Sequence, residues 1–108
     1  MSETPDAAIE YLFKQGKRYA QAKADRIYLE EYRKSLKAIL MKRSMENAVN
    51  AQEREAYSDQ EYIELLNGLK AAVETEEELR WGLIAAQARI EVWRTQEASA
   101  RAEVRATL

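Results

Sequence analysis

Apolar residues in the first part of the chain recur at three- and four-residue intervals, the spacing of one face of an α-helix. This face comprises Ala8, Leu12, Tyr19, Ala22, Leu29, Leu36 and Leu40. Thr4 and Pro5, which precede it, are residue types that commonly open a helix, and Asp6 complements the positive end of the helix dipole. The pattern predicts a first helix from about residue 5 to about residue 50.

A second and longer apolar series begins after Ser58. Ser58 and Glu61 have the spacing of a capping box, in which two side chains satisfy free N–H groups at a helix start. A repeat close to seven residues that is held over this length is typical of a left-handed coiled coil. It predicts a second helix over about residues 59–105. The series comprises Tyr62, Leu65, Leu66, Leu69, Val73, Glu76, Leu79, Leu83, Ala86, Ile90, Trp93, Glu97 and Val104.

The segment between the two series, residues 44–57, has two interpretations. Asn47 and Asn50 disfavour a helix, whereas Ala48, Val49 and Ala51 could continue one. Either the first helix runs on to about residue 52, or a short separate helix turns the corner. We favour continuation, with the turn at about 51–58. The predicted fold is therefore one all-α domain over residues 1–108, a long antiparallel helical hairpin resembling a coiled coil.

Residues 80–94, the most apolar part of the chain, are hydrophobic on two sides of the predicted helix. Leu79, Leu83, Ala86, Ile90 and Trp93 form one stripe, which continues the seven-residue repeat. Trp81, Ile84, Ala88 and Val92 form a second stripe on nearly the opposite side, called the Trp81 stripe below. One stripe is enough to pack a helix against its neighbour, so the second predicts a further partner.

The Trp81 stripe could be buried in either of two ways. Helices of this length would each extend about 68 Å, and a lone hairpin of that shape has much surface for its volume. This favours a homodimer that forms a four-helix assembly. A weaker second face on the first helix agrees with it (Ile27, Ala38, Met41 and Met45). The alternative is a three-helix fold in which residues 44–57 cover Trp81 and Val92.

Charge is unevenly divided along the chain. Residues 14–43 hold ten basic and three acidic side chains, whereas residues 53–108 hold seven basic and twelve acidic ones. A stripe of basic residues on the first helix could follow the phosphates of a nucleic acid. The alternative, which we favour, is that the two helices complement each other electrostatically. The basic stripe comprises Lys23, Arg26, Arg33, Lys34 and Lys37.

The predicted turn also assigns an ion pair. For an antiparallel hairpin that turns near residue 54, the numbers of facing residues add up to about 109. Arg33 then lies opposite Glu76, and we predict a structural ion pair between them. Such a pair fixes the register of two helices more than it adds stability.

The residue types that are absent exclude much of enzyme chemistry. The chain has no cysteine and no histidine, so it cannot form a thiolate nucleophile, a Cys/His zinc site or a histidine general base. Glu74 and the run Glu76–Glu78 could bind a divalent cation, but a solvated helix face explains them better. We expect no enzymatic activity, no metal and no cofactor.

The distribution of apolar residues also bears on location. No stretch approaches the roughly 20 apolar residues needed to span a bilayer. The acidic first ten residues lack the apolar core of a secretory signal. We therefore expect a cytoplasmic protein without a membrane partner.

Two segments, YAQAKADRIYLEEYRKSLKAILM and LRWGLIAAQARIEVWRTQEAS, resemble small helical proteins encoded by tailed bacteriophages, often near replication and recombination genes. The resemblance concerns overall character and rests on no diagnostic motif. It implies a phage or prophage accessory protein working in the host cytoplasm. The first hypothesis is a dimeric, non-enzymatic interaction protein whose further partner, of phage or host, acts in DNA replication, recombination or repair. The alternative is direct nucleic-acid binding through the basic stripe.

Overall fold

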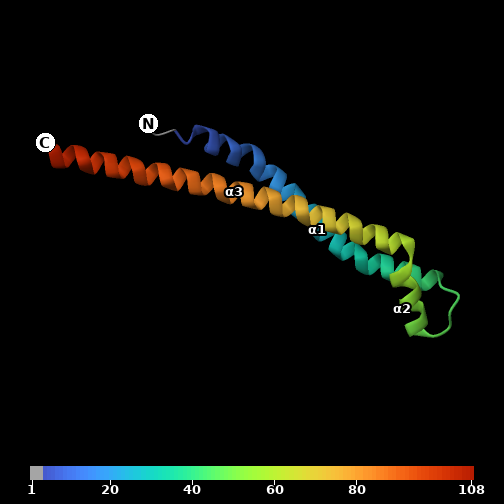
Figure 1. The fold of residues 1–108 in the computed structure, drawn as a ribbon. Helices are drawn as coiled ribbons and strands as arrows, with labels where there is room; N and C mark the ends of the chain where they lie inside the picture. The colour runs from blue at the N-terminus through green and yellow to red at the C-terminus, as the bar shows by residue number, and fades with distance from the viewer. Residues whose placement is uncertain (1–3) are drawn as a thin grey trace. The chain divides into compact units, whose positions relative to one another are not determined.

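The computed structural model describes residues 4–108, and these form three α-helices without any β-strand (Figure 1). The helices are α1 (Asp6–Arg43), α2 (Val49–Ser58) and α3 (Gln60–Thr107). The predicted all-α class is therefore confirmed. The chain divides into two compact units, which we describe separately. The turn unit is residues 21–76, and the terminal unit comprises residues 4–20 and 77–108.

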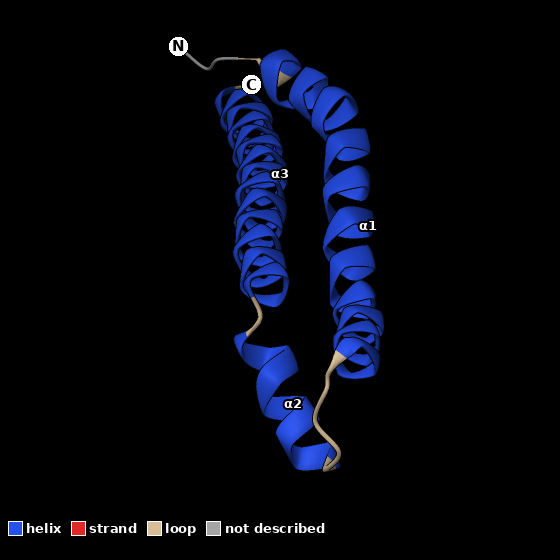
Figure 2. Ribbon diagram, turned by 90° about the vertical axis from the view of Figure 1, so that its right-hand side faces the viewer, coloured by secondary structure: helices blue, strands red, loops and turns tan. Residues whose placement is uncertain are grey.

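The turn unit corrects the predicted path between the two long helices. The first helix was expected to reach about residue 50, with a turn at 51–58, but α1 ends at Arg43 and residues 49–58 form the separate helix α2 (Figure 2). Polar side chains hold the intervening loop. The Ser44 hydroxyl donates to the Glu55 carboxylate at 2.7 Å and accepts the Glu46 backbone N–H at 3.1 Å. Such side-chain bonds offer the backbone an alternative to continued helix.

The start of α3 also differs from the predicted capping box. Ser58 is the last residue of α2, and its hydroxyl donates to the Arg54 carbonyl at 2.8 Å. Asp59 is extended, and its carboxylate accepts the Glu61 backbone N–H at 2.8 Å. Asp59 is therefore the residue that caps α3, because the Ser58 hydroxyl is already engaged by its own helix.

A small apolar core joins the three helices of the turn unit. Leu36 and Leu40 of α1, Ala56 of α2 and Tyr62 of α3 are all buried, and Met41 and Leu65 pack against them. The rings of Tyr57 and Tyr62 meet edge to face with their centroids 5.2 Å apart. Aromatic pairs favour this geometry. α2 folds back onto the two long helices because this buries its residue Ala56 almost completely in the core.

In the terminal unit, the start of α1 packs against α3 through the stripe that continues the seven-residue repeat. Ala8 and Ala86 are buried, while Leu83, Ile90 and Trp93 are half-buried. Of the two stripes predicted on residues 80–94, the Leu79–Trp93 stripe is therefore the internal one. Residues 98–108 are all exposed, although α3 continues to Thr107.

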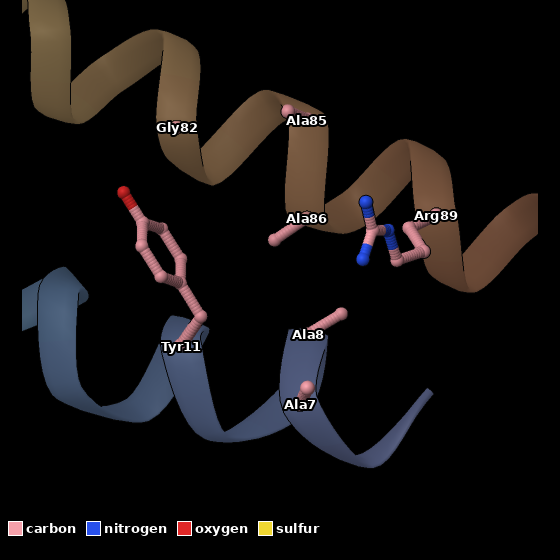
Figure 3. A pocket seen from close by; sticks show the side chains of 7 residues that line it. All are labelled: Ala7, Ala8, Tyr11, Gly82, Ala85, Ala86 and Arg89. Carbon is pink, nitrogen blue, oxygen red and sulfur yellow. The ribbon is translucent and has the colours of Figure 1, made fainter. Parts of the chain in front are cut away.

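Gly82 allows α1 and α3 to approach closely in the terminal unit. The Tyr11 ring points at this glycine, as Figure 3 shows. A Cβ atom at position 82 would overlap the Tyr11 hydroxyl and would lie 3.0 Å from the ring carbon Cζ. By contrast, added Cβ atoms at Gly16 and Gly68 would meet nothing within 4 Å. Gly82 therefore has a packing role, and the other two do not.

We expect Gly16→Ala and Gly68→Ala to raise the melting temperature and Gly82→Ala to raise it less or to lower it. Glycine within a helix costs about 1 kcal/mol relative to alanine, which the first two variants recover. At position 82, displacement of the Tyr11 ring offsets this gain. Thermal denaturation of the three variants at one protein concentration tests the prediction. Equal stabilisation by all three would show that Tyr11 does not constrain position 82.

Candidate interaction surface

The Trp81 stripe lies on the exposed side of α3 in the terminal unit. Trp81 is 59% exposed, Val92 57% and Ile84 38%, and Ala88 is exposed as well. Three large apolar side chains and one alanine at this spacing form a continuous face about three turns long. Residues 44–57, the alternative cover for this stripe, belong to the turn unit. Contiguous exposed apolar surface of this kind is typical of protein interaction sites.

Charged pairs lie at both ends of the Trp81 stripe. At its start, Arg80 contacts the Glu77 carboxylate at 2.8 Å, and its guanidinium carbon lies 4.9 Å from the centre of the Trp81 ring. At its end, Arg94 contacts Glu91 at 3.1 Å. In both pairs the acid precedes the base by three residues. The apolar face is thus bordered by two neutral acid–base pairs.

A cleft of about 410 Å³ lies between α1 and α3 in the terminal unit (Figure 3). Its walls are mainly small side chains, and Arg89 is the charged residue among them. Nothing in this lining resembles a catalytic pair of acid and base. The lining residues are Ala7, Ala8, Tyr11, Gly82, Ala85, Ala86 and Arg89.

In the turn unit, the ion pair of Glu76 differs from the predicted one. Glu76 is only 6% exposed and holds Arg26, with oxygen–nitrogen distances of 2.6 and 3.0 Å. The predicted partner, Arg33, is exposed. The difference arises because α1 ends at residue 43 and α3 begins at residue 60, which centres the turn near residue 52. The numbers of two facing residues then add up to about 103 rather than 109, and this brings Glu76 opposite Arg26.

The Arg26 guanidinium also contacts Glu30 at 3.1 Å. The pKa of Arg26 is raised, mainly because its charged form donates hydrogen bonds to Glu76 and also interacts with Glu30. Two carboxylates thus engage this basic side chain. Arg26 was expected as one of five candidate contacts to nucleic acid, and it instead ties α1 to α3.

Two further members of the basic stripe have acidic partners. Lys34 contacts Glu31 at 3.3 Å. Lys37 contacts Glu53 at 3.5 Å, and its ammonium lies 4.8 Å from the centre of the Tyr57 ring. The pKa of Lys37 is raised, first by a hydrogen bond with Tyr57 and then by Glu53. The Lys34–Glu31 pair lies within α1, whereas Lys37–Glu53 joins α1 to α2 and Arg26–Glu76 joins α1 to α3. The latter two pairs agree with charge complementarity between the helices, the interpretation that the sequence favoured.

The basic stripe still contributes to one hollow of about 370 Å³ in the turn unit, which is lined by Arg33, Lys34, Lys37, Tyr57 and Tyr62. Lys23, the remaining member of the stripe, is exposed and does not line it. The sequence did not assign either tyrosine to this hollow, because their positions follow from the packing of α2, which carries Tyr57, and of the start of α3, which carries Tyr62.

Two properties of the described residues, 4–108, bear on other kinds of site. Their Asp and Glu side chains do not gather into a group of three or more that could hold a metal ion. None of the helices is long and apolar enough to cross a membrane.

The chain matches no protein-family model, no curated protein and no solved structure.

Proposed function

We propose that this is a non-enzymatic helical interaction protein that acts through the Trp81 stripe, and that the stripe binds a second copy of the chain. The observation that carries the proposal is the exposure of Trp81 and Val92 on the side of α3 that faces away from its packed stripe. Tryptophan is among the residues that contribute most to protein–protein interfaces. A homodimer would remove this apolar surface from water.

The charges around the stripe support a second copy as the partner. The surface is apolar at its centre and carries an acid–base pair at each end. Such a surface is neutral and can complement itself, whereas a strongly charged rim would favour a different partner. In the phage setting that the resemblance implies, the dimer would serve as an accessory factor for a protein of DNA replication, recombination or repair.

The environment of Trp81 tests the proposal directly. The chain has two tryptophans, so Trp93→Phe leaves Trp81 as the sole tryptophan fluorophore. We expect its emission to shift to shorter wavelength, and its quenching by acrylamide to fall, as the protein concentration rises. The matched control is Trp81→Phe, which reports half-buried Trp93 and should change less. Emission and quenching of Trp81 that do not vary with concentration would contradict self-association through this face.

A second candidate function is binding of nucleic acid at the basic hollow. The observation that favours it is that Arg33, Lys34 and Tyr57 line the same hollow, since aromatic rings and cations together bind single strands. Lys34 and Lys37 must then exchange carboxylate partners for phosphate. Because these ion pairs would have to break first, nucleic-acid binding is the secondary proposal.

A salt series distinguishes this second function. Affinity for a single-stranded oligonucleotide should fall steeply as the salt concentration rises. Arg33→Gln should reduce the slope of log affinity against log salt concentration by the amount that corresponds to about one phosphate contact. Lys42→Gln removes an exposed charge of the same helix outside the hollow and should not change the slope selectively. Absence of binding at low salt rejects this candidate.

A further inference from the structure

The order of side-chain sizes and charges along the Trp81 stripe distinguishes the two ways in which two copies of α3 can pair. The stripe is centred near residue 86, with Ile84 and Ala88 on either side and Trp81 and Val92 further out. Each half thus contains one large and one smaller side chain. Interfaces pack best where large side chains oppose small ones.

Parallel pairing would place each residue of the stripe against the same residue of the second copy. In register, Trp81 would face Trp81 of the second copy, and Ile84 would face its counterpart. Glu77 and Glu91, which border the stripe, would also approach their own counterparts. Like charges that face each other across an interface weaken it, and facing tryptophans separate the helices at one end.

Antiparallel pairing has the opposite result. When the numbers of two facing residues add up to about 172, Ile84 of one copy lies opposite Ala88 of the second copy. Trp81 of the first copy then lies beside Val92 of the second. Glu77 and Arg80 of one helix then lie alongside Glu91 and Arg94 of the other. The four side chains are already ordered in ion pairs within α3, with contacts of 2.8 and 3.1 Å. Each end of the interface therefore gathers two acidic and two basic groups.

We infer that two copies of the chain pair through antiparallel α3 helices, with Glu77 and Arg80 of one copy set against Glu91 and Arg94 of the other. The inference rests on the proposed function, because it names the orientation of the same self-association. The two-fold axis passes near residue 86, so both ends of the interface are equivalent. The charges select the orientation, and the apolar side chains supply the affinity.

Single cysteines test the orientation, because the natural chain has none. Glu77→Cys and Thr95→Cys are separated by 18 residues, or about 27 Å along the helix. In the antiparallel dimer, position 77 of one copy lies opposite position 95 of the other, within disulfide distance, whereas each position is far from its own counterpart. Oxidation of the two variants mixed should therefore give a cross-linked dimer, and either variant alone should not.

Charge reversal gives an independent readout without cysteine. The double variant Glu77→Arg/Arg80→Glu places like charges together at both ends of an antiparallel dimer and should weaken self-association by about tenfold. Adding Glu91→Arg/Arg94→Glu to the same chain restores opposite charges and should restore the affinity. In a parallel dimer the first double variant would still place like against like, so the affinity would change little.

The outcomes separate this inference from the function on which it rests. Cross-linking of each cysteine variant with itself would overturn the antiparallel orientation but would retain a dimer through the same face. A dimer in sedimentation that cross-links in neither experiment would overturn the inference and move the interface elsewhere. A wild-type chain that stays monomeric would overturn the proposed function itself.

Discussion

Replacing Trp81 with glutamate is expected to abolish the proposed self-association while leaving the helices intact. Trp81 is 59% exposed in the single chain, so the substitution removes little internal packing. In the proposed dimer the same change would remove a large apolar contact from each copy and place two carboxylates in the interface. We expect self-association to weaken by at least about a hundredfold, equivalent to about 3 kcal/mol.

The matched control for this variant is Phe13→Glu. Phe13 belongs to the same unit, is aromatic and is 82% exposed, but it lies on α1 rather than on the stripe. Sedimentation velocity at several concentrations should show a dimer for Phe13→Glu and a monomer for Trp81→Glu. Circular dichroism should show similar helix content in both. If Phe13→Glu dissociates the protein equally well, exposed apolar residues associate without regard to position and the stripe has no special role.

Truncation of Leu40 to alanine is expected to have the largest effect on folding. Leu40 is buried with Ala56 and Tyr62, so it joins all three helices of the turn unit. Removing a buried leucine side chain costs about 2–5 kcal/mol, because the cavity left behind adds to the lost burial. The small core offers few other contacts to compensate. We therefore expect α2 to detach before the long helices unfold.

Urea denaturation followed by circular dichroism measures this effect, and the neighbouring residue supplies its control. Ile39 is next to Leu40 but is partly exposed, so Ile39→Ala should cost considerably less. Susceptibility of residues 44–58 to a protease should increase in Leu40→Ala and not in Ile39→Ala. Equal destabilisation by the two substitutions would show that the core does not depend on the face that contains Leu40.

The periodicity of the sequence was sufficient to predict the two long helices and the face on which α1 is buried, but not the separate helix α2. Ala8, Ala22, Leu36 and Leu40 were all placed on one face, and the structure buries all four. Periodicity succeeds here because the apolar positions repeat over many turns and no local signal opposes them. The composition of the two apolar stripes of residues 80–94 could not show which of them packs against the first helix. Only the continuation of the seven-residue repeat pointed to the Leu79–Trp93 stripe, which the structure packs.

Predictions for the turn region, which depended on short polar segments, were wrong. Ser58 and Asp59 are both good capping residues and are adjacent, so the pattern could not decide which one would start α3. The loop at Ser44 is held by bonds to Glu46 and Glu55, which no periodic pattern encodes. The predicted Arg33–Glu76 pair then failed as well, since a shift of the turn centre by a few residues changes every facing pair.

The central claim, that the Trp81 stripe binds a second copy of the chain, is tested most directly by sedimentation equilibrium of the wild-type protein. A stripe three turns long buries less surface than a standard interface, so the affinity should be on the order of micromolar. Self-association through the stripe predicts a mass of two chains at high concentration that falls toward one chain, 12.5 kDa, on dilution. A mass of one chain throughout the micromolar range and above would contradict it.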